Sequence, residues 1–337
     1  MSRVLEALQN TGERLLSVDG RRWGRITGWT LLVLLLLDVV LGCYWSREPE
    51  PLEVTREEAP VEGQLMGRVL VDVTSTLWDK PGGYLSNDIL PHRLWLVRMP
   101  AWEQGLLATS RDLARVLEEE MGYPREEDAA DEDLSRARTQ LHFDAHSWAM
   151  PNSRREFERG VRALESWIER LETEPEEAVF HRDAAALDAW LEKVQARLDE
   201  QTLLLSRQTG QPRGHVRAER RAGGDERRMH EPGERRAAVF YQTRGTAWAL
   251  LHLVHAAQIE FAELLEERDA EEALRKLAIE LEATQAPVRS PVILNGSGFG
   301  VLANHSLVMA DHVSRAHAAV ARARAALRQD AGAADGQ

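Results

Sequence analysis

One uninterrupted apolar run near the N-terminus constrains this chain more than any other feature. Residues 26–45 read ITGWTLLVLLLLDVVLGCYW, about 20 residues with a single acid among them. An α-helix rises about 1.5 Å per residue, so the run reaches about 30 Å, the thickness of a bilayer's hydrocarbon core. The sequence therefore predicts one membrane-spanning helix over residues 26–45.

The charges on the two sides of this run predict its orientation. Arg21, Arg22 and Arg25 come just before it, whereas residues 46–63 after it are acidic and hold three prolines. Positively charged flanks of a span stay in the cytoplasm. We therefore expect residues 1–25 to be cytoplasmic and the bulk of the chain to lie outside the cytoplasm.

Two residues inside the run carry separate hypotheses. Cys43 follows Gly42, as in a lipoprotein signal that is cut before the cysteine, but Asp38 interrupts the apolar run and the stretch ahead of it is long for a cleaved signal. An uncleaved anchor is therefore favoured, and lipidation of Cys43 is left open. A carboxylate such as Asp38 costs roughly 2.5–3.5 kcal/mol near the centre of a span, which predicts an intramembrane polar contact. The alternative is a tolerated carboxylate near the outer face.

Composition excludes several classes of protein. The chain has 337 residues, which is enough to bury a real core, and a formal net charge of −13. Nucleic-acid binding needs a clustered basic surface, so no nucleic-acid partner is expected. The chain has one cysteine, which excludes an internal disulfide and a thiolate metal cluster.

Beyond the span the chain is predicted to be all-α. Residues 46–63 hold acids and prolines and few apolar residues, which predicts a flexible tether. Residues 64–328 are predicted to be an extracytoplasmic domain resembling a helical bundle. Apolar residues at spacings of three and four indicate its helices. These helices are expected at residues 66–77, 106–121, 153–171, 187–198, 237–268, 274–281 and 303–328.

Some boundaries and one pairing within the domain also follow from local signals. Ser153 and Glu156 have the spacing of a capping box and are predicted to open the helix over 153–171. Because the connector to the next helix is short, these two helices are predicted to form an antiparallel hairpin. Residues 213–236 combine arginine, glycine and acid with almost no apolar residue, which predicts a mobile insertion, and residues 329–337 are predicted to be a disordered tail.

One long loop, near residues 79–101, is the least ordinary part of the domain. Its proline and paired glycines predict a tight reversal with positive φ, and its polar side chains are candidates for binding a ligand. The candidate binding residues are Asp79, Lys80, Gly82, Gly83, Tyr84, Ser86, Asn87 and Asp88. The alternative is a structural loop that aromatic residues, including Trp95 and Trp102, hold against the core.

No catalytic residue and no metal site is predicted. His142 and His146 are four residues apart with Asp144 between them, but no third ligand stands at motif spacing. The glycines in residues 296–300 lack the spacing of a dinucleotide-binding loop and indicate a hinge or a tight passage between helices. No cofactor is expected.

Three stretches and the N-terminal anchor carry a family resemblance. The stretches are DKPGGYLSNDILP at 79–91, RMPAWEQGLL at 98–107 and HFDAHSWAMPNSRREFERGVRALE at 142–165. Together they resemble a family of uncharacterised proteobacterial inner-membrane proteins, a domain of unknown function, from the anchor to near the C-terminus. The resemblance implies a bacterial inner-membrane location. It supplies no activity, cofactor or catalytic residue.

The sequence thus predicts a single-pass inner-membrane protein whose periplasmic helical domain is an envelope interaction or scaffold module. The expected partners are the inner membrane and either a membrane or periplasmic protein or a second copy of the chain. One alternative is an envelope-associated, hydrolase-like enzyme that uses the 79–88 loop, with His142 and His146; the other is a carrier of lipid or a small ligand. An enzyme needs converging titratable groups, a scaffold an exposed apolar patch, and a carrier an apolar cavity.

Overall fold

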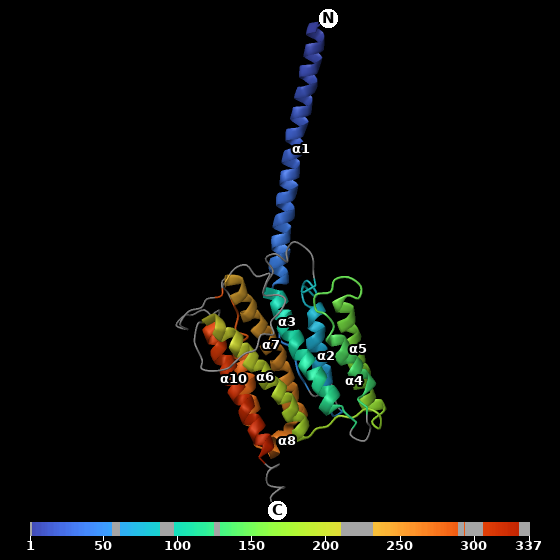
Figure 1. The fold of residues 1–337 in the computed structure, drawn as a ribbon, viewed down its shortest axis with the longest axis vertical. Coiled ribbons are helices and arrows are strands. Elements are labelled where there is room, and N and C mark those ends of the chain that lie inside the picture. The colour runs from blue at the N-terminus through green and yellow to red at the C-terminus, as the bar shows by residue number, and fades with distance from the viewer. Residues whose placement is uncertain are drawn as a thin grey trace, which may run out of the picture. The chain divides into compact units, whose positions relative to one another are not determined.

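The described residues form helices joined by loops. The computed structural model describes residues 2–55, 61–87, 98–124, 129–209, 232–288, 293 and 306–329, and these residues contain no strand (Figure 1). The predicted all-α class is confirmed. The chain divides into two compact units, Met1–Arg47 and Glu48–Gln337.

The first unit is one helix, α1 (Ser2–Trp45). Within it, Trp23–Gly42 has a mean hydropathy of 1.8, and its side chains are not buried. Within this stretch the Thr30 hydroxyl donates a hydrogen bond to the Ile26 carbonyl 2.9 Å away, so this hydroxyl is satisfied within the helix. The stretch is therefore long and apolar enough to cross a membrane, a property that spans share with signal sequences.

The second unit contains the other helices of the described chain. They are α2 (Gln64–Asp79), α3 (Arg98–Val116), α4 (Glu132–Leu141), α5 (Ser153–Thr173), α6 (Ala184–Thr209), α7 (Pro232–Glu260), α8 (Ala262–Glu267), α9 (Glu271–Ala283) and α10 (Ser306–Arg328). A π-helical turn, η3 (Leu117–Met121), extends α3 and ends at Met121, the last residue of the helix predicted over 106–121.

The most extensive helix pair of the described elements is α3 with α7, and the two helices touch through their backbones. A Cβ atom on Gly105 of α3 would lie 2.1 Å from the Gln242 carbonyl oxygen. A Cβ atom on Gly245 of α7 would lie 2.0 Å from the Trp102 carbonyl oxygen. Neither position has room for a side chain, so glycine at both positions allows this close approach.

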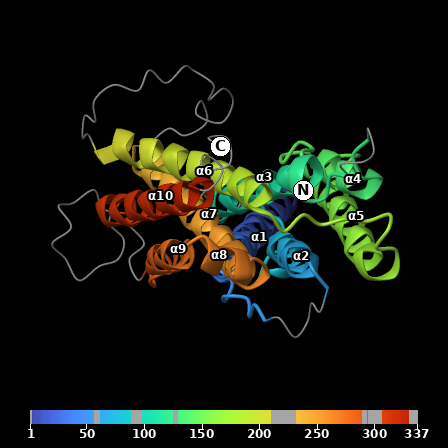
Figure 2. The ribbon, with the colours of Figure 1, turned by 90° about the horizontal axis from the view of Figure 1, so that it is seen from below.

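The other helices pack on the two sides of this pair. The helices α6, α9 and α10 lie on one side and α4 and α5 on the other, as Figure 2 shows. Helix α2 contacts α5, α7 and α3, and so joins the two sides. The core between them is built from large buried side chains, including Trp102, Trp167, Trp190, Phe157 and Phe240.

The predicted hairpin of α5 and α6 is wrong. Helix α5 packs against α4 and α2, whereas α6 packs against α10 and α3. The connector between α5 and α6 is held by contacts with distant residues, because the His181 N–H donates to the Met121 carbonyl at 2.6 Å. In the same connector the ring of Phe180 packs between those of Trp167 and Phe261, at centroid distances of 6.4 and 5.9 Å. These contacts direct α6 away from α5.

The predicted capping box at Ser153 is also wrong, by one residue. Asn152 is the N-cap of α5, and its side chain accepts a hydrogen bond from the Arg154 N–H at 3.0 Å. Ser153 is the first helical residue, and its hydroxyl is 2.7 Å from the Asp144 carbonyl and 2.9 Å from the Ser147 carbonyl. The hydroxyl therefore holds the preceding loop and does not cap the helix.

Two further predictions meet the described residues only in part. Most of the predicted insertion 213–236 lies outside the described residues, and 232–236 form the start of α7. Of the predicted tail 329–337, only Gln329 is described. The single helix predicted over 237–268 is two helices, α7 and α8, with a break at Phe261.

The contact between α3 and α7 makes Gly245→Ala a sharp test of the packing. The added methyl group would overlap the Trp102 carbonyl and force the two helices apart, so we expect a loss of about 1–3 kcal/mol in the free energy of unfolding. Urea unfolding of the full chain in mild detergent, followed by circular dichroism, measures this loss. The matched control is Gly160→Ala in α5, where the nearest atoms lie 3.2 Å from the added Cβ. Equal stability of the two variants would contradict the proposed role of the contact.

Candidate functional site

The predicted binding loop turns most of its polar groups inward. Lys80, Tyr84 and Ser86 are buried, whereas Asp79 ends α2 with its side chain exposed. Gly82 and Gly83 have φ values of 85° and 66°, as the predicted tight reversal requires. The last candidate residue, Asp88, lies outside the described residues.

The carboxylate of Glu103 on α3 organises this loop. The Lys80 Nζ atom lies 2.6 Å from Glu103 Oε1, and neither side chain has any exposed surface. The backbone N–H groups of Leu85 and Ser86 donate to the same carboxylate at 2.9 and 2.8 Å, and the Ser86 hydroxyl donates at 2.6 Å. Lys80 also donates to the Gly83 carbonyl. The buried charges are thus paired, and both carboxylate oxygens of Glu103 accept further hydrogen bonds.

Sequence reasoning did not find Glu103, although a signal was present. The residue is an acid in the stretch AWEQGLL, between Trp102 and the buried Leu106. A charge at that place in an apolar helix face predicts a buried partner of opposite charge. The chain has few lysines, and Lys80 is the one that is buried among the described residues.

The loop over residues 142–152 rests on the 80–87 loop. The Tyr84 hydroxyl donates to the Ala145 carbonyl at 2.8 Å, and burial raises the pKa of Tyr84 far above its usual range. The Asn87 side chain donates to the Ser147 carbonyl at 3.2 Å. The His146 Nδ1 atom lies 3.1 Å from the Ser86 carbonyl, so it is the protonated nitrogen of that contact. The two loops therefore form one hydrogen-bonded unit.

The histidine pair of the sequence does not form a common site. His142 Nδ1 lies 2.9 Å from the Arg138 carbonyl of its own helix, whereas His146 contacts the other loop. Burial lowers the pKa of His142 below its usual value. Within the part of the chain that the structure describes, no three His, Cys, Asp or Glu side chains come together as metal ligands would.

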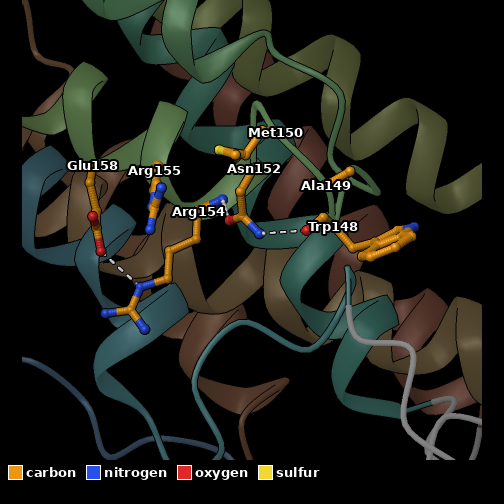
Figure 3. A pocket seen from close by; sticks show the side chains of 7 residues that line it. All are labelled: Trp148, Ala149, Met150, Asn152, Arg154, Arg155 and Glu158. Carbon is orange, nitrogen blue, oxygen red and sulfur yellow. Dashed lines mark hydrogen bonds and ion pairs between the residues drawn. The ribbon is translucent and has the colours of Figure 1, made fainter.

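Two apolar side chains of the 142–152 loop are exposed to solvent. Trp148 is 62% exposed and Met150 is 88% exposed. Together with the start of α5 they line an open hollow of about 500 Å³. Its lining residues are Trp148, Ala149, Met150, Asn152, Arg154, Arg155 and Glu158. Figure 3 shows the indole of Trp148 directed away from Arg154 and Glu158, which pair at the opposite end.

The first residues of the second unit are bonded to its core. Glu48 accepts a hydrogen bond from Arg244 Nε on α7 at 2.8 Å, and the Arg244 side chain is 3% exposed. Arg244 Nη1 also donates to the Thr284 and Ala286 carbonyls after α9, at 2.6 and 3.0 Å. One guanidinium therefore joins Glu48, α7 and the C-terminal end of α9.

A second contact fixes the same stretch four residues further on. The Leu52 N–H donates to His252 Nε2 at 2.9 Å, and His252 Nδ1 donates to the Trp248 carbonyl at 2.7 Å. These two bonds require a neutral imidazole, and burial lowers the pKa of His252 to about 4. The predicted tether is thus held at Glu48 and Leu52, and its last residue is held where the Gly63 N–H donates to Glu260 at 2.9 Å. Its flexibility stays a prediction for the residues between Leu52 and Gly63.

Two predictions on α1 are not decided by these contacts. Asp38 is half-buried within Trp23–Gly42, and its intramembrane polar contact stays a prediction. Cys43 belongs to the helical part of α1, and its lipidation stays open.

Comparison with known proteins identifies the family of this chain, and the description of that family names no activity. The model of the family described as "Uncharacterized protein conserved in bacteria (DUF2333)" matches residues 17–330, so the chain belongs to this family. No curated protein and no solved structure matches the chain. The family resemblance predicted from the sequence is therefore confirmed.

The buried pair of Lys80 and Glu103 predicts a large effect of Lys80→Met. Removing the cation leaves a carboxylate buried without a counter-charge, which costs about 3–5 kcal/mol of unfolding free energy. Urea unfolding of the full chain in mild detergent measures the loss. Asp79→Asn, at the exposed neighbouring residue, is the control, and it should change stability by less than about 0.5 kcal/mol. If Lys80→Met were as stable as this control, the pair would not organise the loop.

The lowered pKa of His252 predicts that stability depends on pH. A folded-state pKa of about 4 against a usual value of 6.5 means that stability is fully present above pH 6.5 and is lost as pH falls toward 4. The total loss is on the order of 3 kcal/mol. Urea unfolding at a series of pH values measures it, and His252→Gln should flatten this part of the profile. Above pH 7 the parent and the variant should differ by a constant amount; parallel profiles down to pH 4 would contradict the assignment.

Proposed function

We propose that this chain is a single-pass protein of the bacterial inner membrane whose helical second unit is periplasmic and serves as an interaction module. The apolar stretch Trp23–Gly42, the arginines ahead of it and the acidic stretch after it support this topology. Membership of a family conserved in bacteria is consistent with it.

One observation supports the interaction role most directly. In the 80–87 loop most of the polar side chains are buried, whereas two large apolar side chains of the 142–152 loop are exposed. The ion pair of Lys80 and Glu103 has no exposed surface, so it cannot meet a substrate. Trp148 and Met150 are exposed, and they belong to the 142–152 loop, which is bonded to the 80–87 loop. Among the described residues of the second unit, Ile279 on α9 is the one other large apolar side chain that is exposed. Exposed apolar groups on a fixed support are typical of a contact surface.

The two alternative functions lack a comparable observation. The polar groups of the 80–87 loop, and His142 and His146, bond mainly to backbone groups or to one another, and they do not converge on a pocket. The hollow beside Trp148 is open to solvent and lined in part by charged side chains, unlike the enclosed apolar cavity of a carrier. The expected partners remain the inner membrane and a membrane or periplasmic protein, or a second copy of the chain.

Photo-crosslinking in intact cells tests this proposal. We expect a photo-reactive residue in place of Met150 to give a strong adduct with another envelope component, because its position is exposed and apolar. Gel mobility and mass spectrometry detect the adduct and identify its chemical class.

The control position is Glu176, which is exposed in the connector between α5 and α6. A photo-reactive residue there should give no comparable adduct. In a Cys43→Ser background, Glu176→Cys should also react with a membrane-impermeant maleimide applied to the periplasmic side. Equal adducts at both positions would contradict the interaction surface, and labelling of position 176 only after the inner membrane is opened would contradict the topology.

A further inference from the structure

The surface around Trp148 lies at the same end of the second unit as the first residues of that unit. Glu48 is bonded to Arg244, and the adjacent glycine of α7 touches the backbone of Trp102 on α3. The next residue of α3, Glu103, holds the loop on which Ser147 rests. Figure 1 shows the N-terminal ends of α3 and α5 at the same end of the unit.

The covalent chain limits how far this end can be from a membrane that holds α1. The apolar stretch ends at Gly42, and Glu48 follows six positions later. Each residue spans at most about 3.6 Å, so Glu48 can lie no more than about 22 Å from the end of the span. Since Glu48 is bonded to Arg244, the part of the second unit around Arg244 stays attached close to the end of the span.

The side chains around the hollow have the chemistry of a bilayer surface. The indole of Trp148 is amphipathic and prefers the headgroup layer, and Met150 is a flexible apolar side chain beside it. Arg154 and Arg155 are exposed in the first turn of α5, where the helix dipole disfavours cations. A folding role alone would therefore favour acids at these positions, whereas arginines match the phosphates of anionic lipids.

Neither arginine is fully occupied by the protein. Arg154 pairs with Glu158 at 2.7 Å, but half of its side chain is exposed. Arg155 makes no ion pair with the residues that the structure describes, and in Figure 3 its guanidinium lies beside the hollow. Both therefore have donors left for a phosphate group.

The surface is also held in its exposed form before any contact. The Asn152 side chain donates to the Trp148 carbonyl at 3.2 Å, and the Ser147 hydroxyl donates to the Pro151 carbonyl at 2.7 Å. The loop between these residues is thus closed on itself and fixed to the 80–87 loop. A surface that is ordered in advance loses little conformational entropy on binding.

We propose that residues 147–155 form a second membrane contact, in which Trp148 and Met150 enter the headgroup layer and Arg154 and Arg155 bind phosphates of anionic phospholipids. The inference rests on the anchored topology proposed above, and it names the bilayer as the partner of the same surface. The contact holds the second unit in one orientation on the membrane.

Fluorescence quenching in nanodiscs tests the contact with the full-length protein. Met150→Cys in a Cys43→Ser background carries an environment-sensitive fluorophore, and the discs contain brominated lipids with or without phosphatidylglycerol. We expect strong quenching by bromolipid in discs rich in phosphatidylglycerol and weaker quenching in phosphatidylcholine alone. The double variant Arg154→Gln, Arg155→Gln should lower the equilibrium constant between the lipid-bound and the free form of this surface by roughly tenfold in the anionic discs. Trp148→Ser should also reduce quenching.

The control is the same label at Glu176→Cys, one length of α5 away, about 30 Å. It should stay accessible to aqueous iodide in all discs. Equal iodide access at positions 150 and 176, without quenching by bromolipid, would overturn the lipid contact. Shielding of position 150 only after membrane proteins are added would overturn it in favour of a protein partner and leave the interaction module standing. Extraction of the chain from native membranes by alkaline carbonate would overturn the anchored topology, and the inference with it.

Discussion

The second unit depends on the direct contact between the backbones of α3 and α7. Gly105 and Gly245 bring the two helices so close that a methyl group on either would overlap a backbone atom of the other. On one side of this contact α7 presents Arg244 to Glu48, and on the other α3 presents Glu103 to the 80–87 loop. The two polar clusters are therefore placed by a single helix crossing, and a change at the crossing would displace both.

The buried ion pair links this helix packing to the position of the two surface loops. Paired charges in a core add little net stability, because desolvation offsets their attraction, but they demand one arrangement of the groups around them. Here the carboxylate of Glu103 fixes the 80–87 loop, and that loop fixes residues 142–152 through backbone carbonyls. This arrangement leaves Trp148 and Met150 exposed to solvent. Their exposure gives up the free energy that burial of a large apolar side chain would contribute.

Periodicity predicted the helices of this protein better than it predicted their neighbours. The long apolar helix, the start of the second unit's helices at Gln64, the helix end at Met121 and the reversal at Gly82 all follow from local composition or spacing. The pairing of α5 with α4 and the bond between Glu48 and Arg244 join distant positions, so no local signal encodes them. For the candidate site, the sequence indicated the 80–87 loop but not Glu103 on α3, whose carboxylate holds the loop. Side chains that looked available for a ligand are used by the fold, and the exposed pair was read as part of a family motif.

The bond between Glu48 and Arg244 has a mechanical consequence. Only Ser46 and Arg47 separate the end of α1 from the first residue that is tied to the core of the second unit. The same guanidinium is tied to the carbonyls that follow α9, so a pull or a twist on α1 would load α7 and α9 directly. A displacement of α1 beyond the reach of two residues must therefore break an ion pair or move these helices.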